Sequence, residues 1–125
     1  MSRPIALLTD FGLKDHYVGS IKSVILKLHP KALFFDLTHD IRPQNVREGA
    51  FVLSAIYPYL PKGTIVLAIV DPGVGSQRQA LCIKTSRGFL IGPNNGIFTS
   101  VLEEEEPVEA RGIVNDRYWI KPVSA

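Results

Sequence analysis

Apolar segments alternate with amphipathic ones between residues 3 and 70, and this alternation leaves few folds open to the chain. The segments "RPIALLT" (3–9), "ALFFDLT" (32–38) and "TIVLAIV" (64–70) are apolar along almost their whole length. Between them, apolar residues recur at helical spacing in 15–30 and 45–60. Strands of this kind are typical of a parallel sheet that is covered on both faces and built from right-handed crossovers. We therefore predict an α/β fold with a mainly parallel sheet and helices on both faces, a Rossmann-like three-layer arrangement.

Cap and turn residues mark where these segments begin and end. Asp15 is a predicted N-cap of the first helix, which Pro30 closes. Asn45 and Glu48 have the spacing of a capping box at the start of the second helix. The rest of the chain is predicted to form strands over 80–86 and 87–92, a short helix over 96–106, and extended segments over 108–115 and 118–123.

Composition narrows the class of protein. A chain of 125 residues with 46% hydrophobic and 21% charged residues is typical of one soluble globular domain, here 1–125. A net charge of +2 is too weak to indicate nucleic-acid binding. The single cysteine, Cys82, excludes an internal disulfide and fits a reducing compartment. No apolar stretch is long enough for a signal peptide or a membrane span. We expect a cytoplasmic protein that binds neither nucleic acid nor membranes.

Acidic residues follow each of the three predicted strands. The first strand leads into Asp10, the second contains "DLTHD" with Asp36, His39 and Asp40, and the third leads into Asp71. In an open α/β sheet, ligands bind beyond the carboxyl ends of the strands. The sequence therefore predicts a binding site at this edge of the sheet.

The segment "VDPGVGSQR" (70–78) carries the clearest chemistry. Its glycines allow the backbone to approach a ligand closely, and Arg78 is near enough to Asp71 to keep that carboxylate ionised and oriented, or only to staple the loop. The segment lacks the lysine of a phosphate-binding loop. The two oxygens of Asp10 suit the vicinal diol of a ribose. These residues alone leave a nucleoside site and a metal site open.

Four linked motifs resemble one known family. "LLTDFG..DHYVGSIKSVIL", "DLTHDIRPQNVREGA", "GTIVLAIVDPGVGSQR" and "GPNNGIFTSVLEE" stand in the order and spacing of the S-adenosylmethionine hydroxide adenosyltransferases, which are relatives of the bacterial fluorinase and chlorinase. The resemblance implies cleavage of S-adenosylmethionine by water at the ribose 5′ carbon, which yields adenosine and methionine. It implies no cofactor and no metal, and a homotrimer with its sites between subunits.

The resemblance also assigns residues. Asp10 matches the carboxylate that holds the ribose hydroxyls, and Asp71 and Arg78 match two members of an Asp-Arg-His set that activates water. The fluorinase has a tyrosine at the position of Asp71, so this sequence resembles the hydrolase branch. Gln44 stands where the halogenating relatives have an aromatic wall. Two further positions line the sugar and the reacting carbon: Pro72 and Val74.

Two parts of the family pattern have no match within residues 1–125. These are the histidine of a "TFHGRD"-like segment and the C-terminal β-barrel domain, so the resemblance implies an N-terminal α/β domain, incomplete at its C-terminal end and inactive alone. Two rival readings stand beside it. One is a phosphatase-like hydrolase whose divalent metal is held by Asp10, His39, Asp40 and Asp71. The other is a non-catalytic domain that binds a nucleoside or packs with copies of itself.

Overall fold

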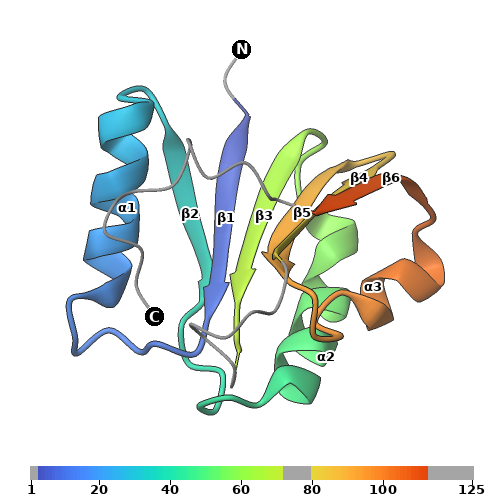
Figure 1. Ribbon diagram of the computed structural model, residues 1–125, viewed down its shortest axis with the longest axis horizontal. Coiled ribbons are helices and arrows are strands. Elements are labelled where there is room, and N and C mark those ends of the chain that lie inside the picture. The colour runs from blue at the N-terminus through green and yellow to red at the C-terminus, as the bar shows by residue number, and fades with distance from the viewer. Residues whose placement is uncertain (1–2, 72–79, 113–125) are drawn as a thin grey trace.

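Six strands form one mixed sheet in the computed structural model, which describes residues 3–71 and 80–112 (Figure 1). Every predicted segment inside this range is found as an element of the expected type. In chain order the elements are β1 (Pro4–Thr9), α1 (Tyr17–Leu28), β2 (Leu33–Thr38), α2 (Val46–Ile56), a 3₁₀ turn (Tyr57–Tyr59), β3 (Thr64–Ile69), β4 (Ala80–Thr85), β5 (Gly88–Pro93), α3 (Thr99–Glu104) and β6 (Pro107–Gly112).

The strand order is β2-β1-β3-β5-β4-β6. Strands β2, β1, β3 and β5 are parallel to one another, while β4 is antiparallel to both β5 and β6. The prediction of a mainly parallel sheet is confirmed for the first four of these strands. The antiparallel end arises because β4 and β5 are joined by a tight turn, which cannot make the crossover that parallel strands need.

The two faces of the sheet carry different helices. Leu8 of β1 and Leu53 of α2 belong to the same fully buried cluster, which α3 also joins. On the other face, Lys22 of α1 contacts Asp36 of β2, whose register partner in β1 is Leu7. Because successive residues of a strand point to opposite faces, α1 lies on the face opposite α2. The predicted three-layer arrangement is confirmed, with α1 beside β2 and α2 and α3 toward β5 in Figure 1.

The apolar strands are not buried equally on their two faces. In β3, Val66 and Ala68 are fully buried against the side of α2 and α3. Their neighbours Ile65, Leu67 and Ile69 face the side of α1 and are only half-buried. The expectation that both faces are fully covered is therefore correct for one face and only partly correct for the other.

The ends of the helices agree with the sequence at one point and differ at another. Asn45 caps α2, because its side-chain oxygen accepts the backbone N–H of Glu48 at 3.0 Å. Asp15 was expected to cap α1, and this is wrong. The helix begins one residue later than expected, so His16 takes the N-cap position. The side chain of His16 makes no capping hydrogen bond.

Strand β5 approaches its neighbour closely at Gly92. A Cβ built there would collide with the carbonyl oxygen of Ala68 and would stand 2.9 Å from the ring of Phe98. A Cβ built at Gly88 would collide in the same way with the backbone carbonyl oxygen of Thr64. Glycine is thus required at both places by lack of space.

The helices are short. The longest in the described ranges, α1, has 12 residues, and within those ranges no helix combines the length and apolar character needed to cross a membrane.

Candidate functional site

Two of the predicted site residues lie at the same edge of the sheet. Asp10 follows directly after β1, and Asp71 follows β3 after one intervening residue. The two strands are parallel neighbours in which Thr9 is the register partner of Ile69. Both carboxylates are half-buried. The prediction that neighbouring strand ends deliver acidic groups to one edge is confirmed for this pair.

The carboxylate of Asp10 is held by a backbone group from another loop. Its Oδ2 accepts a hydrogen bond of 2.5 Å from the N–H of Gln44, 34 residues along the chain. This contact brings together two of the four residues that the resemblance assigns to binding the substrate. Within the described residues, Oδ1 of Asp10 makes no hydrogen bond.

Gln44 has an unusual backbone. Its φ of 64° makes it the non-glycine residue with positive φ in the described part of the chain. A non-glycine residue in this region costs about 1 kcal/mol and persists only where its surroundings enforce it. Here the conformation aims the N–H of Gln44 at Asp10, which is a reason to place a functional site at this edge.

Part of the predicted site lies outside the described residues. Pro72, Val74 and Arg78 belong to the segment 72–79, which the structure does not describe. The predicted pairing of Asp71 with Arg78 therefore stays a prediction.

The role of Asn95, in the turn after β5, is not apparent from the sequence. Its Nδ2 donates to the carbonyl of Val70 at 2.8 Å, and its Oδ1 accepts the N–H of Ile97 at 3.1 Å. The side chain thus ties the turn after β5 to the residue that precedes Asp71. The signal in the sequence was the "NNG" run, which indicates a turn but not its partner across the sheet.

The residues of the metal alternative are not gathered into one cluster. His39 is buried and turns its ring toward Thr9 and Asp36, with Nδ1 2.7 Å from the hydroxyl of Thr9. Asp40 is exposed. Among residues 3–71 and 80–112, no three His, Cys, Asp or Glu side chains come together as metal ligands would.

Asp36 occupies a charged contact between β2 and α1. Its Oδ1 is 2.8 Å from Nε2 of His39, at an angle short of hydrogen-bond geometry, and its Oδ2 is 3.1 Å from Nζ of Lys22. Burial alone would raise the pKa of Asp36, but the contact with His39 and the hydrogen bond from Lys22 outweigh it and lower the pKa below the usual 3.8.

This lowered pKa predicts a pH dependence of stability. The charged contact stabilises the fold fully above about pH 3.8 and less as the pH falls through the lower folded value, where Asp36 takes up a proton. We expect Asp36→Asn to reduce the dependence of the free energy of unfolding on pH in this acidic range. Urea unfolding at a series of pH values measures it. The effect is small, since the Asp36 side chain is 39% exposed. Parallel pH curves for the two proteins would contradict the prediction.

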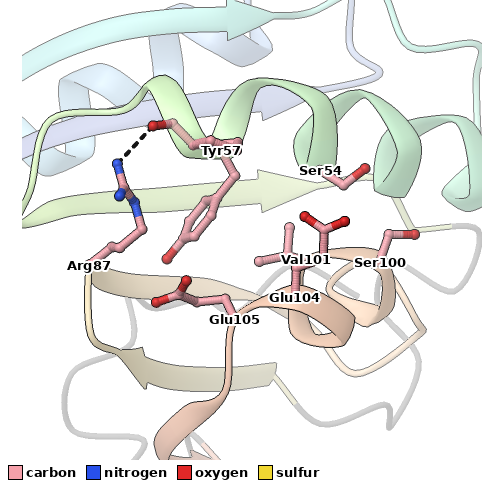
Figure 2. Close-up of a pocket in the computed structure, with 8 residues that line it drawn as sticks. Ser54, Tyr57, Arg87, Ser100, Val101, Glu104 and Glu105 are labelled. Carbon is pink, nitrogen blue, oxygen red and sulfur yellow. Dashed lines mark hydrogen bonds between the residues drawn. The ribbon is translucent and has the colours of Figure 1, made fainter.

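A pocket of about 130 Å³ lies between α2 with its following 3₁₀ turn, the β4–β5 turn and α3 (Figure 2). Tyr57 and Arg87 form one side of it, and Ser100, Glu104 and Glu105 line the other. Its volume is below the roughly 300 Å³ at which small-molecule sites begin. We assign no ligand to this pocket.

Hydrogen bonds show that the residues of this pocket join elements of the fold. Tyr57 bonds the hydroxyl of Thr85 at 2.7 Å, and Arg87 donates to the carbonyls of Pro58 and Leu60, each at 2.9 Å. Burial raises the pKa of Tyr57 above 10.0, so its hydroxyl remains protonated at neutral pH. The pocket therefore adjoins the contact between the 3₁₀ turn after α2 and the β4–β5 turn.

Comparison with known proteins gives one family. The model of the SAM hydroxide adenosyltransferase N-terminal domain matches residues 5–125. The chain is 45% identical over 97 residues to an (R)-S-adenosyl-L-methionine hydrolase of Thermus thermophilus, covering 78% of this chain and 38% of the relative. For the hydrolase of Methanocaldococcus jannaschii the identity is 43%, over 80% of this chain and 40% of the relative. A fluorinase of an Actinoplanes species is 26% identical, over 90% and 46%.

Solved structures agree with this match. An uncharacterized conserved protein from Thermotoga maritima is similar with a TM-score of 0.87 and 42% identity, over 90% of this chain and 44% of that one. A conserved hypothetical protein from Thermus thermophilus gives a TM-score of 0.83 and 41% identity, over 92% and 48%. The chain spans less than half the length of each of these relatives.

Proposed function

Because the chain belongs to the SAM hydroxide adenosyltransferase family, we propose that the full-length protein hydrolyses S-adenosylmethionine to adenosine and methionine. The observation that carries the proposal is the Asp10 carboxylate at the end of β1, fixed by the N–H of Gln44 and next to the strand that leads into Asp71. The relatives named S-adenosylmethionine hydrolases support it. The lower identity to the fluorinase, and an aspartate at position 71, favour water over halide as the nucleophile.

The proposed reaction needs few catalytic groups. The oxygen of water forms a bond to the 5′ carbon of the ribose while the carbon–sulfur bond breaks, and the electron pair of the broken bond stays on sulfur. Methionine leaves as a neutral thioether, so no general acid is needed. The site has to hold the substrate, align one water opposite the sulfur and accept its proton. In our proposal Asp10 holds the ribose hydroxyls, and Asp71, oriented by Arg78, positions the water and takes up the proton.

The remaining features of the proposal follow the resemblance and the composition. Pro72 and Val74 line the sugar and the reacting carbon, and Gln44 also contributes to binding the substrate, at the position of the aromatic wall of the halogenating relatives. The protein acts without a metal or other cofactor, as a homotrimer in the cytoplasm, and does not bind nucleic acid.

The assignment of Asp10 predicts a preference for a complete ribose diol. Adenosine should bind the full-length protein roughly tenfold or more tightly than 2′-deoxyadenosine, because a hydrogen bond to a charged group contributes about 1.5–3 kcal/mol. Asp10→Asn should remove this preference. Titration calorimetry with both nucleosides measures it, with Asp40→Asn as a control that keeps the preference, because Asp40 is exposed and belongs to the metal alternative only. Equal affinities for the two nucleosides in the wild type would sink the assignment.

A further inference from the structure

A row of three polar side chains begins at Thr9, next to Asp10 in the chain, and is buried at Thr9 and His39 and exposed at Asp36. The hydroxyl of Thr9 is 2.7 Å from Nδ1 of His39, and Nε2 of His39 is 2.8 Å from Oδ1 of Asp36. Thr9 is 1% exposed and His39 is 5% exposed. Polar groups buried this deeply are costly unless they bond one another, so the row calls for a reason.

The order of hydroxyl, imidazole and carboxylate is the order found in serine hydrolases. A nucleophile must be reached by its substrate, and Thr9 is closed off from solvent. Its oxygen also accepts the backbone N–H of Phe11 at 3.2 Å. Thr9 therefore does not attack a substrate. Any role of these side chains in function has to come from the neighbouring groups that they position.

The Asp36 carboxylate indicates the direction of each bond. Its negative charge, 2.8 Å from Nε2 of His39, favours a ring proton on that nitrogen although the contact is bent. In this tautomer of the neutral ring Nδ1 is an acceptor, and the Thr9 hydroxyl donates to it. The same hydroxyl oxygen accepts the N–H of Phe11.

The same two residues hold the loop that carries Asp10. Thr9 binds the N–H of Phe11 through its hydroxyl, and His39 accepts the N–H of Gly12 with its backbone oxygen at 2.7 Å. The N–H groups of both residues that follow Asp10 are thus hydrogen-bonded to Thr9 or to His39. Because Thr9 and His39 are also hydrogen-bonded to each other, these contacts form one connected network.

We propose that Thr9 and His39 are positioning residues for Asp10, and that their hydrogen bond sets how tightly the site binds the ribose of its ligand. This role rests on the proposed function, in which Asp10 holds the ribose hydroxyls. Loss of the Thr9 hydroxyl frees the loop at Phe11 and leaves Nδ1 of His39 without a donor.

The matched variants are Thr9→Val, which keeps the shape and removes the hydroxyl, and Thr9→Ser, which keeps the hydroxyl. In the full-length protein we expect Thr9→Val to weaken adenosine binding about tenfold and Thr9→Ser to stay within about twofold of the wild type. Calorimetry with adenosine measures the affinities, and thermal unfolding confirms that each variant is folded. Should Thr9→Val not fold, Thr9→Ala removes the same hydroxyl without forcing a new methyl group into the site.

NMR of the histidine ring nitrogens gives a second reading, which tests the hydrogen bond between Thr9 and His39 directly. In the wild type and in Thr9→Ser, Nδ1 of His39 should have the shift of a hydrogen-bonded acceptor, and Nε2 that of a protonated nitrogen. In Thr9→Val the Nδ1 signal should move toward that of an acceptor without a donor. Equal adenosine binding by Thr9→Val and wild type overturns this proposal and leaves the proposed function standing. No adenosine binding by the wild type overturns the proposed function itself.

Discussion

Asp71→Asn is expected to slow adenosine release from S-adenosylmethionine about 100-fold or more in the full-length protein, with a much smaller change in substrate affinity. In the proposed mechanism the carboxylate orients the attacking water and takes up its proton, whereas asparagine can do only the first of these. The same proposal assigns the substrate to Asp10, which lies at the neighbouring strand end. Chromatography of adenosine formed under single-turnover conditions separates the chemical step from binding.

Asp40→Asn is the control for this prediction. Asp40 is exposed near the same edge of the sheet, and the metal alternative needs it while the proposed hydrolysis does not. Wild-type turnover in Asp40→Asn, unaffected by EDTA, is the expected result. Unchanged turnover in Asp71→Asn would remove Asp71 from the mechanism, and turnover abolished by EDTA would favour the metal alternative.

Gly92→Ala is expected to lower the free energy of unfolding by about 3 kcal/mol or more. The added methyl group would collide with the carbonyl oxygen of Ala68 in β3 and press on the ring of Phe98. A backbone oxygen cannot turn aside as a side chain can, so β5 has to move away from β3. Urea unfolding followed by circular dichroism measures the loss.

Gly19→Ala is the matched comparison, and it is expected to raise the free energy of unfolding rather than lower it. Gly19 lies within α1, and a Cβ built there meets nothing within 4 Å. Alanine in this helix should raise the stability by about 0.5–1 kcal/mol, because it restricts the unfolded chain. Similar effects of the two substitutions would show that β5 has more room than its contacts indicate.

Local patterns in the sequence were sufficient to predict most of the elements. The apolar segments ending at Thr9 and Val70 and the capping residue Asn45 each act through neighbours close in sequence, so the strands and the start of α2 were predicted correctly. The same locality predicted that Asp10 and Asp71 lie at one edge, because parallel strands end together.

Contacts between distant residues could not be predicted in this way. The antiparallel pairing of β4 with β5 and β6 leaves no mark on periodicity, which reports only which residues share a face. His39 was predicted as part of a metal site in one reading, but its partners are Thr9, 30 residues away, and Asp36. The bond from Asn95 to Val70 crosses 25 residues. Each of these contacts exists only once the sheet has formed.

The hydrogen bond that holds the Asp10 carboxylate is donated by the main-chain N–H of Gln44, a group that every amino acid except proline possesses. The side chain at position 44 can consequently differ without removing the hydrogen bond that holds the Asp10 carboxylate. An amide in one branch of the family and an aromatic wall in another are compatible with this hydrogen bond, provided that the residue tolerates a positive φ. Proline is excluded at this position, and β-branched residues are disfavoured. Under the proposed function, the contact of the ligand with the side chain at position 44 can therefore change while the contact between Asp10 and the ribose is kept.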